Sequence, residues 1–217
     1  EMLGPMLGTI HNLRYQGVFD WPFVSELLSL SGGLFNQDYI EYYGKANFMK
    51  AALVMADAVT TVSPSYASEI QSSGYGETLD GVLRARGRVS GILNGLDESL
   101  YDPATDPYIA AHFSADDLAG KARCKRDLQD YFNLDADADA PIVGMVTRLT
   151  DQKGLDLIEQ AMERFMDRRM QFVMLGTGER RYEQLFSWAC WRWPGRVGCW
   201  LEHNPPMANR VYAGSDM

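Results

Sequence analysis

The stretch Ile142–Gly154, IVGMVTRLTDQKG, decides the fold. Its first five residues, Ile142–Val146, form a short apolar run after a proline, which is typical of a buried parallel strand. A polar loop follows the run. Beyond the loop, apolar residues recur at the spacing of one helix face: Leu155, Ile158, Ala161, Met162, Phe165 and Met166. A buried strand, a loop and an amphipathic helix together form one unit of an α/β fold.

The loop of this unit carries two cations, Arg148 and Lys153, at the end of the predicted strand. Ligands of open α/β sheets bind outside the carboxyl ends of the strands. The planar fork of an arginine and the point charge of a lysine suit a diphosphate. The same pattern also fits two solvated loop cations, so the spacing by itself leaves both interpretations open.

The rest of the chain repeats the alternation of strand and helix, which predicts parallel sheets covered by helices. Ser63 and Pro64 predict the start of a helix. The segment Tyr39–Asp57 is expected to be helical, and Ser114 is expected to cap a helix that runs to Phe132. Strands are expected near residues 6, 58, 89, 142, 171 and 197.

Composition limits the possible functions. The 217 residues suffice for one or two domains with a core. The net charge of −9 without a basic cluster argues against a nucleic-acid partner and weakly against an anionic membrane surface. Three cysteines without metal-ligand spacing fit a reducing compartment. No run is long enough to span a bilayer. The chain begins at Glu1 and stops just after a predicted helix, so we expect a fragment.

Three motifs resemble one enzyme family. TRLTDQKGLDL (147–157) resembles S-R-L-T-x-Q-K-G-L-D of bacterial glycogen synthases and plant starch synthases, TIHNLRYQG (9–17) resembles their T-I-H-N-L-x-Y-Q-G, and ILNGLD (92–97) resembles their I-L-N-G-I-D. These retaining glucosyltransferases have two Rossmann-like domains, the GT-B fold. The resemblance covers essentially the whole chain. It implies that residues 1–93 are the latter part of the N-terminal, acceptor-side domain. Residues 94–217 would be a linker and the first part of the C-terminal nucleotide-sugar-binding domain.

The resemblance implies a glycosyltransferase of glycogen or starch biosynthesis. Such an enzyme transfers glucose from ADP-glucose to the non-reducing end of an α-1,4-glucan with retention. Its partners would be ADP-glucose and the glucan, with no nucleic acid, membrane, cofactor or metal. This piece alone is expected to be inactive. The alternatives are a GT-B transferase using UDP-glucose and a non-catalytic glucan-binding paralogue. The expected compartment is the bacterial cytoplasm, or the plastid if the source is a plant or alga.

The resemblance also implies roles for individual residues. Arg148 and Lys153 would hold the nucleotide diphosphate, and His11 would line the cleft near the transferred glucose; these three form the expected catalytic set. His203 occupies the place of a family tyrosine that stacks on adenine, whereas Glu202 replaces a glycine. These two replacements alter the place where the family binds the nucleotide base. The expected substrate-binding residues are Asn12, Asn94, Gly176, Gly178 and His203.

Overall fold

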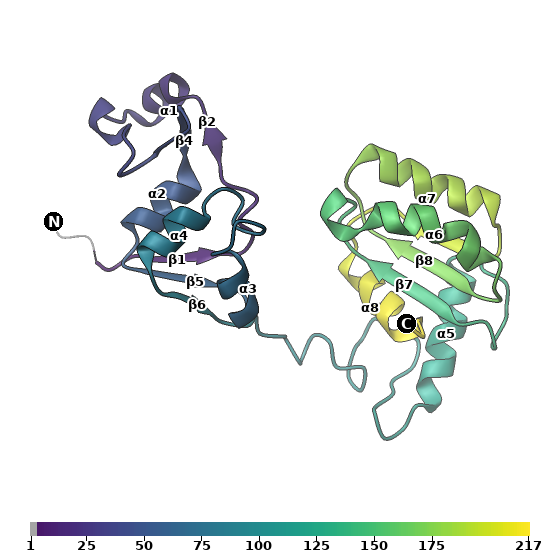
Figure 1. Ribbon diagram of the computed structural model, residues 1–217. Helices are drawn as coiled ribbons and strands as arrows, with labels where there is room; N and C mark the ends of the chain where they lie inside the picture. The colour runs from purple at the N-terminus through teal and green to yellow at the C-terminus, as the bar shows by residue number, and fades with distance from the viewer. Residues whose placement is uncertain (1–3) are drawn as a thin grey trace. The chain divides into compact units, whose positions relative to one another are not determined.

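The computed structural model describes residues 4–217, and the chain divides into two compact units, Glu1–Leu96 and Asp97–Met217 (Figure 1). Each unit contains a parallel three-stranded sheet with helices packed against it. The predicted α/β class with parallel sheets is therefore confirmed. None of the helices in the described part of the chain is long and apolar enough to cross a membrane.

The main sheet of the first unit has the order β1-β5-β6. Ile10 pairs with Thr61 and Thr61 pairs with Gly91, so all three parallel strands end at one edge. A second, antiparallel sheet has the order β2-β4-β3. The elements are β1 (Leu7–Ile10), β2 (Val18–Phe19), α1 (Trp21–Leu28), η1 (Gly32–Leu34), β3 (Glu41–Tyr42), β4 (Lys45–Asn47), α2 (Phe48–Met55), β5 (Ala58–Thr61), α3 (Pro64–Glu69), α4 (Asp80–Arg86) and β6 (Val89–Gly91).

Helix α3 begins where Ser63 and Pro64 predict it. The Tyr66 amide donates to the Ser63 hydroxyl at 3.1 Å, and Pro64 occupies the first helical position. Gly91 at the end of β6 lies directly against this start. A Cβ at Gly91 would lie 2.3 Å from the backbone of Ser63 and Pro64, so the packing of β6 against α3 requires a glycine.

The expectation of a helix over Tyr39–Asp57 is wrong for its first half. The chain there forms the hairpin β3-β4, and α2 begins only at Phe48. Tyr43 and Gly44 both have positive φ, 50° and 77°, which is the backbone of a tight hairpin turn. The side chain of Asn47 then accepts a hydrogen bond from the Lys50 amide at 2.9 Å and caps the shorter helix.

The second unit is a three-layer sandwich around a parallel sheet of order β7-β8-β9 (Figure 1). Helices α6 and α7 cover one face, and α5 and α8 cover the other. The elements are α5 (Ala119–Tyr131), β7 (Ile142–Val146), η2 (Asp151–Lys153), α6 (Leu155–Met166), β8 (Gln171–Leu175), α7 (Arg180–Arg192), β9 (Val197–Trp200) and α8 (Pro205–Gly214).

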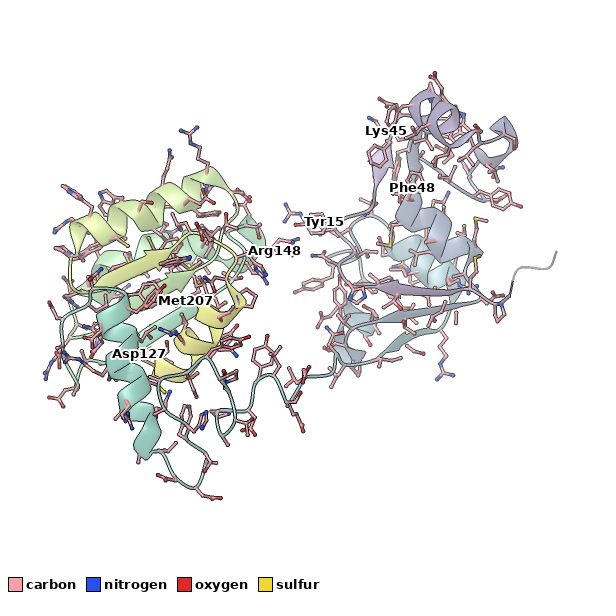
Figure 2. All side chains as sticks on the ribbon, turned by 180° about the vertical axis from the view of Figure 1, so that it is seen from behind. Tyr15, Lys45, Phe48, Asp127, Arg148 and Met207 are labelled. Atoms are coloured by element: carbon pink, nitrogen blue, oxygen red, sulfur yellow. The ribbon has the colours of Figure 1, made fainter. Side chains whose placement is uncertain are left out.

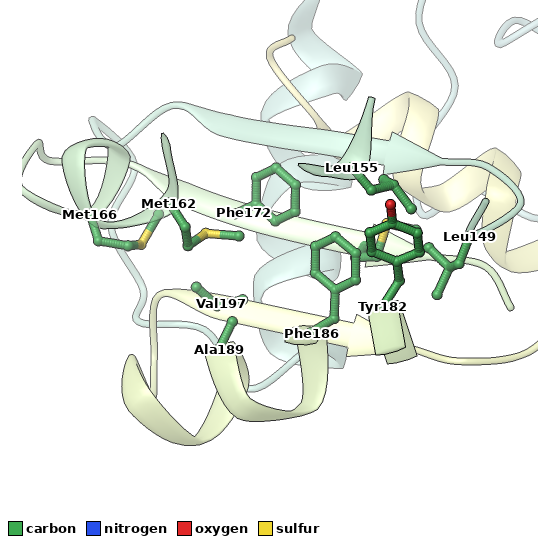
Figure 3. Packing of buried hydrophobic residues seen from close by; sticks show 10 residues of the cluster. Leu149, Leu155, Met162, Met166, Phe172, Tyr182, Phe186, Ala189 and Val197 are labelled. Atoms are coloured by element: carbon green, nitrogen blue, oxygen red, sulfur yellow. The ribbon is translucent and has the colours of Figure 1, made fainter. Parts of the chain in front are cut away.

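The central strand β8 has every residue buried and supplies both cores. Phe172 and Met174 face the core shared with α6 and α7, where Phe172 stacks on Phe186 with ring centroids 6.1 Å apart (Figure 3). Val173 and Leu175 face the core shared with α5 and α8. This alternation is the two-residue period of a strand that is covered on both sides.

The expectation that Ser114 caps a helix is also wrong. The Ser114 hydroxyl accepts a hydrogen bond from the Asp117 amide at 3.2 Å, but this contact closes a local turn. Helix α5 begins at Ala119, whose amide is bonded at 3.0 Å to the Asp117 carboxylate. The backbone of His112 lies close to the first turn of α5, because a Cβ on Gly120 would lie 2.0 Å from the carbonyl oxygen of His112.

Candidate functional site

The candidate site lies at the carboxyl edge of the second sheet, where the loops after β7 and β8 run side by side. The Thr147 amide donates to the Leu175 carbonyl at 3.1 Å, and the Leu149 amide donates to the Thr177 carbonyl at 3.0 Å. Arg148 lies between these two hydrogen bonds. The loop after β8 therefore fixes the backbone that carries Arg148.

Two glycines allow the loops to come this close. A Cβ on Gly176 would lie 1.8 Å from the Thr147 carbonyl oxygen, and one on Gly178 would lie 2.4 Å from that of Leu149. The sequence predicts that these glycines admit a ligand. The structure adds a second reason for both, because loop packing requires them with or without a ligand.

The two predicted phosphate-binding cations lie on the loop after β7. Lys153 ends the turn η2, and Gly154 then adopts a left-handed φ of 66° at the start of α6. Arg148, labelled in Figure 2, and Lys153 are both exposed. Within residues 4–217, neither side chain is hydrogen-bonded or paired with a carboxylate. Their charges are therefore available to an anionic ligand.

A pocket of about 310 Å³ opens beside Arg148. It unites three of the predicted site residues, Arg148, Gly176 and His203, whereas Lys153 and Gly178 lie on the same two loops outside its lining. The loops after all three strands form its wall, together with the first turn of α8. The lining residues are Tyr101, Val146, Thr147, Arg148, Leu175, Gly176, Thr177, Glu202, His203, Asn204, Pro205, Ala208 and Tyr212.

The pocket wall combines charged groups of both signs with aromatic rings. Arg148 supplies a cation, Glu202 supplies a carboxylate, and Tyr101 and Tyr212 supply rings whose centroids are 6.3 Å apart. The start of α8 adds the positive end of a helix dipole, and Asn204 caps that helix. Such a wall can hold an anionic group at one place and a flat ring at another.

The two tyrosines are site residues that the sequence analysis missed. Tyr101 lies in the segment YDPATDPY, whose two prolines are typical of a linker, and Tyr212 lies near the end of a helix. Neither position carries a local signal for binding. The fold alone places their rings in one pocket, since they are more than a hundred residues apart in the chain.

Helix α7 anchors both loops through the side chains of Glu183 and Tyr182. Glu183 accepts hydrogen bonds from the Thr177 hydroxyl at 2.6 Å and from the Gly178 amide at 3.1 Å, and these bonds hold the pKa of Glu183 below its usual value. Tyr182 donates to the Asp151 carboxylate at 2.7 Å, which raises the pKa of Tyr182 to about 12. The first turns of α7 thus hold the loops of the candidate site in place.

The remaining predicted residues belong to the first unit. His11 directly follows β1 and is exposed, and Asn12 is half-buried with its side-chain oxygen bonded to the Arg14 amide at 3.1 Å. Asn94 is exposed and follows β6. The strand order β1-β5-β6 places His11 and Asn94 beyond the ends of the two outer strands, at the same sheet edge, and these strands lie roughly 10 Å apart across two strand spacings.

The part of the chain that the structure describes contains no group of three or more His, Cys, Asp or Glu side chains able to hold a metal ion.

Comparison with known proteins identifies the family. Residues 4–85 match the family model of the starch synthase catalytic domain. Glycogen synthases from Bacillus cereus (strain ATCC 10987 / NRS 248) and Geobacillus stearothermophilus are 46% and 47% identical over 210 residues, which is 96% of this chain and 44% and 43% of those proteins. A solved structure, the catalytic domain of starch synthase IV from Arabidopsis thaliana bound to ADP and acarbose, matches 98% of this chain and 45% of its own, with 33% identity and a TM-score of 0.89.

The chain belongs to the glycogen and starch synthase family. It spans less than half the length of the relatives that it matches. The resemblance that the three motifs indicate is therefore confirmed.

One feature of this family member departs from the family pattern. Glu202 and His203 stand where the resemblance implies a glycine and a tyrosine. The structure places Glu202 and His203 in the pocket wall, and the Trp200 indole donates to the Glu202 carboxylate at 3.3 Å. The departure therefore changes the lining of the pocket beside Arg148 and adds an acidic group to it.

Proposed function

We propose that this chain is part of a glycogen synthase that transfers glucose from ADP-glucose to the non-reducing end of an α-1,4-glucan with retention. The observation that carries the proposal is the pair Arg148 and Lys153, two exposed cations beside a pocket at the sheet edge that have no carboxylate partner among residues 4–217. Family membership supports it, as does the relative from Arabidopsis thaliana that was solved with ADP and acarbose.

The chemistry explains why such cations are needed. The bond between the anomeric carbon and the diphosphate oxygen breaks, a bond to the acceptor oxygen forms, and ADP and a proton are released. Negative charge then grows on the diphosphate while positive charge grows on the sugar ring. Fixed cations aimed at the leaving oxygens stabilise that transition state, and such electrostatic stabilisation is usually the largest single contribution to catalysis. We assign this role to Arg148 and Lys153.

The other residues receive supporting roles in the proposal. His11, with Asn12 and Asn94, would contact the glucose and the leaving-group region from the first unit, which would be the acceptor-side domain. In the second unit, the nucleotide-binding domain of the proposal, Gly176 and Gly178 would border the nucleotide, and His203 would contact the base. The residue boundary proposed between the two domains is 93/94. The proposed compartment is the bacterial cytoplasm, in keeping with the bacterial relatives.

The proposal is tested by calorimetric titration of the chain with ADP and with UDP. The double variant Arg148→Ala, Lys153→Ala removes the two cations. Arg164→Ala, an exposed cation on α6, is the matched control. We expect binding of ADP, weaker binding of UDP, loss of binding in the double variant and no change in the control. Equal ADP binding by the chain and the double variant would refute the assignment of the site.

The same titration separates the alternatives. Tighter binding of UDP than of ADP would favour a transferase that uses UDP-glucose. Binding of a maltooligosaccharide without either nucleotide would favour a glucan-binding paralogue. Turnover is measured in the full-length protein, where the proposal expects that either single substitution, Arg148→Ala or Lys153→Ala, lowers kcat more than it raises KM.

A further inference from the structure

The turn Asp151–Lys153 ends at Lys153, and its first residue, Asp151, is hydrogen-bonded to helix α7. Tyr182 donates from its hydroxyl to Asp151 Oδ1 at 2.7 Å, and Asp151 is the first residue of the turn that Lys153 ends. The Asp151 amide donates to Glu179 Oε1 at 3.3 Å, and Arg181 Nη1 lies 3.9 Å from Asp151 Oδ1. Three contacts, from the N-cap residue and the first turn of α7, therefore converge on one residue of the turn.

The donor in the shortest of these contacts is rigid. The ring of Tyr182 is only 1% exposed and packs in the core beside Leu149 and Leu155 (Figure 3). Its hydroxyl reaches the exposed carboxylate of Asp151. A hydroxyl on a ring held by the core has one position, so the carboxylate that accepts its hydrogen bond is also held in one position.

The position of the Asp151 carboxylate matters for the charge of Lys153. The two side chains lie two residues apart on one short turn, and a free carboxylate there would compete with a phosphate for the ammonium group. Tyr182 and Arg181 instead engage this carboxylate, and Lys153 has no carboxylate partner among residues 4–217. The contacts thus fix the backbone of the turn and leave its cation available.

We propose that Tyr182 and Asp151 are positioning residues for diphosphate binding, which hold the turn Asp151–Lys153 in place and keep Lys153 free for the phosphates. The inference deepens the proposed function and rests on it, because the position of Lys153 matters only if the loop binds a diphosphate. Nothing in the family motif requires the pair, since Asp151 occupies its variable position and Tyr182 lies outside it.

The decisive variant is Tyr182→Phe, which removes one oxygen and keeps the buried ring. We expect its affinity for ADP to fall about 5- to 10-fold, the size of the net contribution of one ordinary hydrogen bond. Its affinity for AMP should fall less, because AMP offers one phosphate fewer to Lys153. Tyr131→Phe, an exposed tyrosine of the same unit, is the matched control and should bind both nucleotides normally.

Further variants distinguish a positioning role from a purely structural one. Asp151→Asn keeps an oxygen that accepts the tyrosine hydrogen bond and should bind ADP within about 2-fold of the unaltered chain, whereas Asp151→Ala should match Tyr182→Phe. In the background of Lys153→Ala, adding Tyr182→Phe should cause no further loss of ADP affinity. A structural role alone would produce the same loss in both backgrounds.

The outcomes are distinguishable. Normal ADP binding by Tyr182→Phe, or an undiminished loss in the Lys153→Ala background, would overturn the positioning role and leave the proposed function standing. Failure of the unaltered chain to bind ADP would overturn the proposed function and this inference with it. Loss of ADP binding in Tyr182→Phe that disappears in the Lys153→Ala background would support both.

Discussion

Gly176→Ala tests the link between the fold and the candidate site. The added methyl carbon would lie 1.8 Å from the Thr147 carbonyl oxygen, and real Cβ atoms essentially never come closer than 3.0 Å to such a neighbour. The obstacle is backbone, which cannot rotate aside as a flexible side chain can. The loops after β7 and β8 must therefore move apart by about 1.2 Å at this point.

Moving the loops apart should lower both the stability of the fold and the affinity for ADP. Overpacking of this kind destabilises a protein by about 1–3 kcal/mol. The hydrogen bond from the Thr147 amide to Leu175, now 3.1 Å long, adjoins the contact and would lengthen. At roughly 4 °C per kcal/mol for a domain of this size, Tm should fall by about 4–12 °C. Arg148 directly follows Thr147 in the loop that must move, so its guanidinium would shift. The affinity for ADP should therefore drop about 10-fold or more.

The assay is thermal unfolding combined with calorimetric titration of ADP. Gly74→Ala is the matched control, because a Cβ there meets nothing within 4 Å. The control should keep its Tm within about 2 °C and bind ADP normally. Unchanged Tm and unchanged ADP affinity in Gly176→Ala would refute the argument that loop packing requires this glycine and positions Arg148.

Three other predictions concern stability. Phe186→Ala should lower the free energy of unfolding by about 3–5 kcal/mol in urea titrations, because the ring is fully buried, whereas Trp191→Ala, 76% exposed, should change it by less than about 0.5 kcal/mol. Lys50→Met should lower the free energy of unfolding by about 1–3 kcal/mol, because the buried ammonium donates to two backbone carbonyls. Lys45→Met, at an exposed lysine, should lower it by less than about 1 kcal/mol. Equal losses in the two variants would contradict this account. The raised pKa of Tyr182, about 12 against 10, means that its hydrogen bond stabilises the fold fully below pH 10, and that the stability gap between the chain and Tyr182→Phe should close between pH 10 and 12. A gap that stays constant over this range would contradict the ionisation argument.

Local sequence signals predicted the elements of the sheets well. The apolar run Ile142–Val146 and the helix that follows Gly154 appear with nearly the predicted bounds, although only Ile142 of the run is fully buried, because β7 is an outer strand. Ser63 and Pro64 start α3 as predicted. These signals are physical and local: a strand covered on both faces needs continuous apolar residues, and an orphan amide at a helix start needs an oxygen acceptor.

The wrong predictions arose where local signals compete. Over Tyr39–Asp57, one apolar stripe fits a helix, but the turn at Tyr43 and Gly44 and the cap at Asn47 divide the segment into a hairpin and a shorter helix. At Ser114, the hydroxyl and the acidic residue three positions later fit a helix cap as well as a turn. The Ser114 hydroxyl closes a turn with the Asp117 amide, and the Asp117 carboxylate accepts from the Ala119 amide where α5 begins.

By itself, the sequence determined the α/β class, the family and the two cations of the loop after β7, because periodicity and motif letters are properties of neighbouring residues. Tertiary structure alone decided which residues share a pocket, and it brought Tyr101 and Tyr212 to the wall beside Arg148. It also revealed that Gly176 serves loop packing and that Tyr182 holds the turn of Lys153. These facts depend on contacts between distant segments, and only the packing of helices on the sheet brings those segments within a few ångströms of one another.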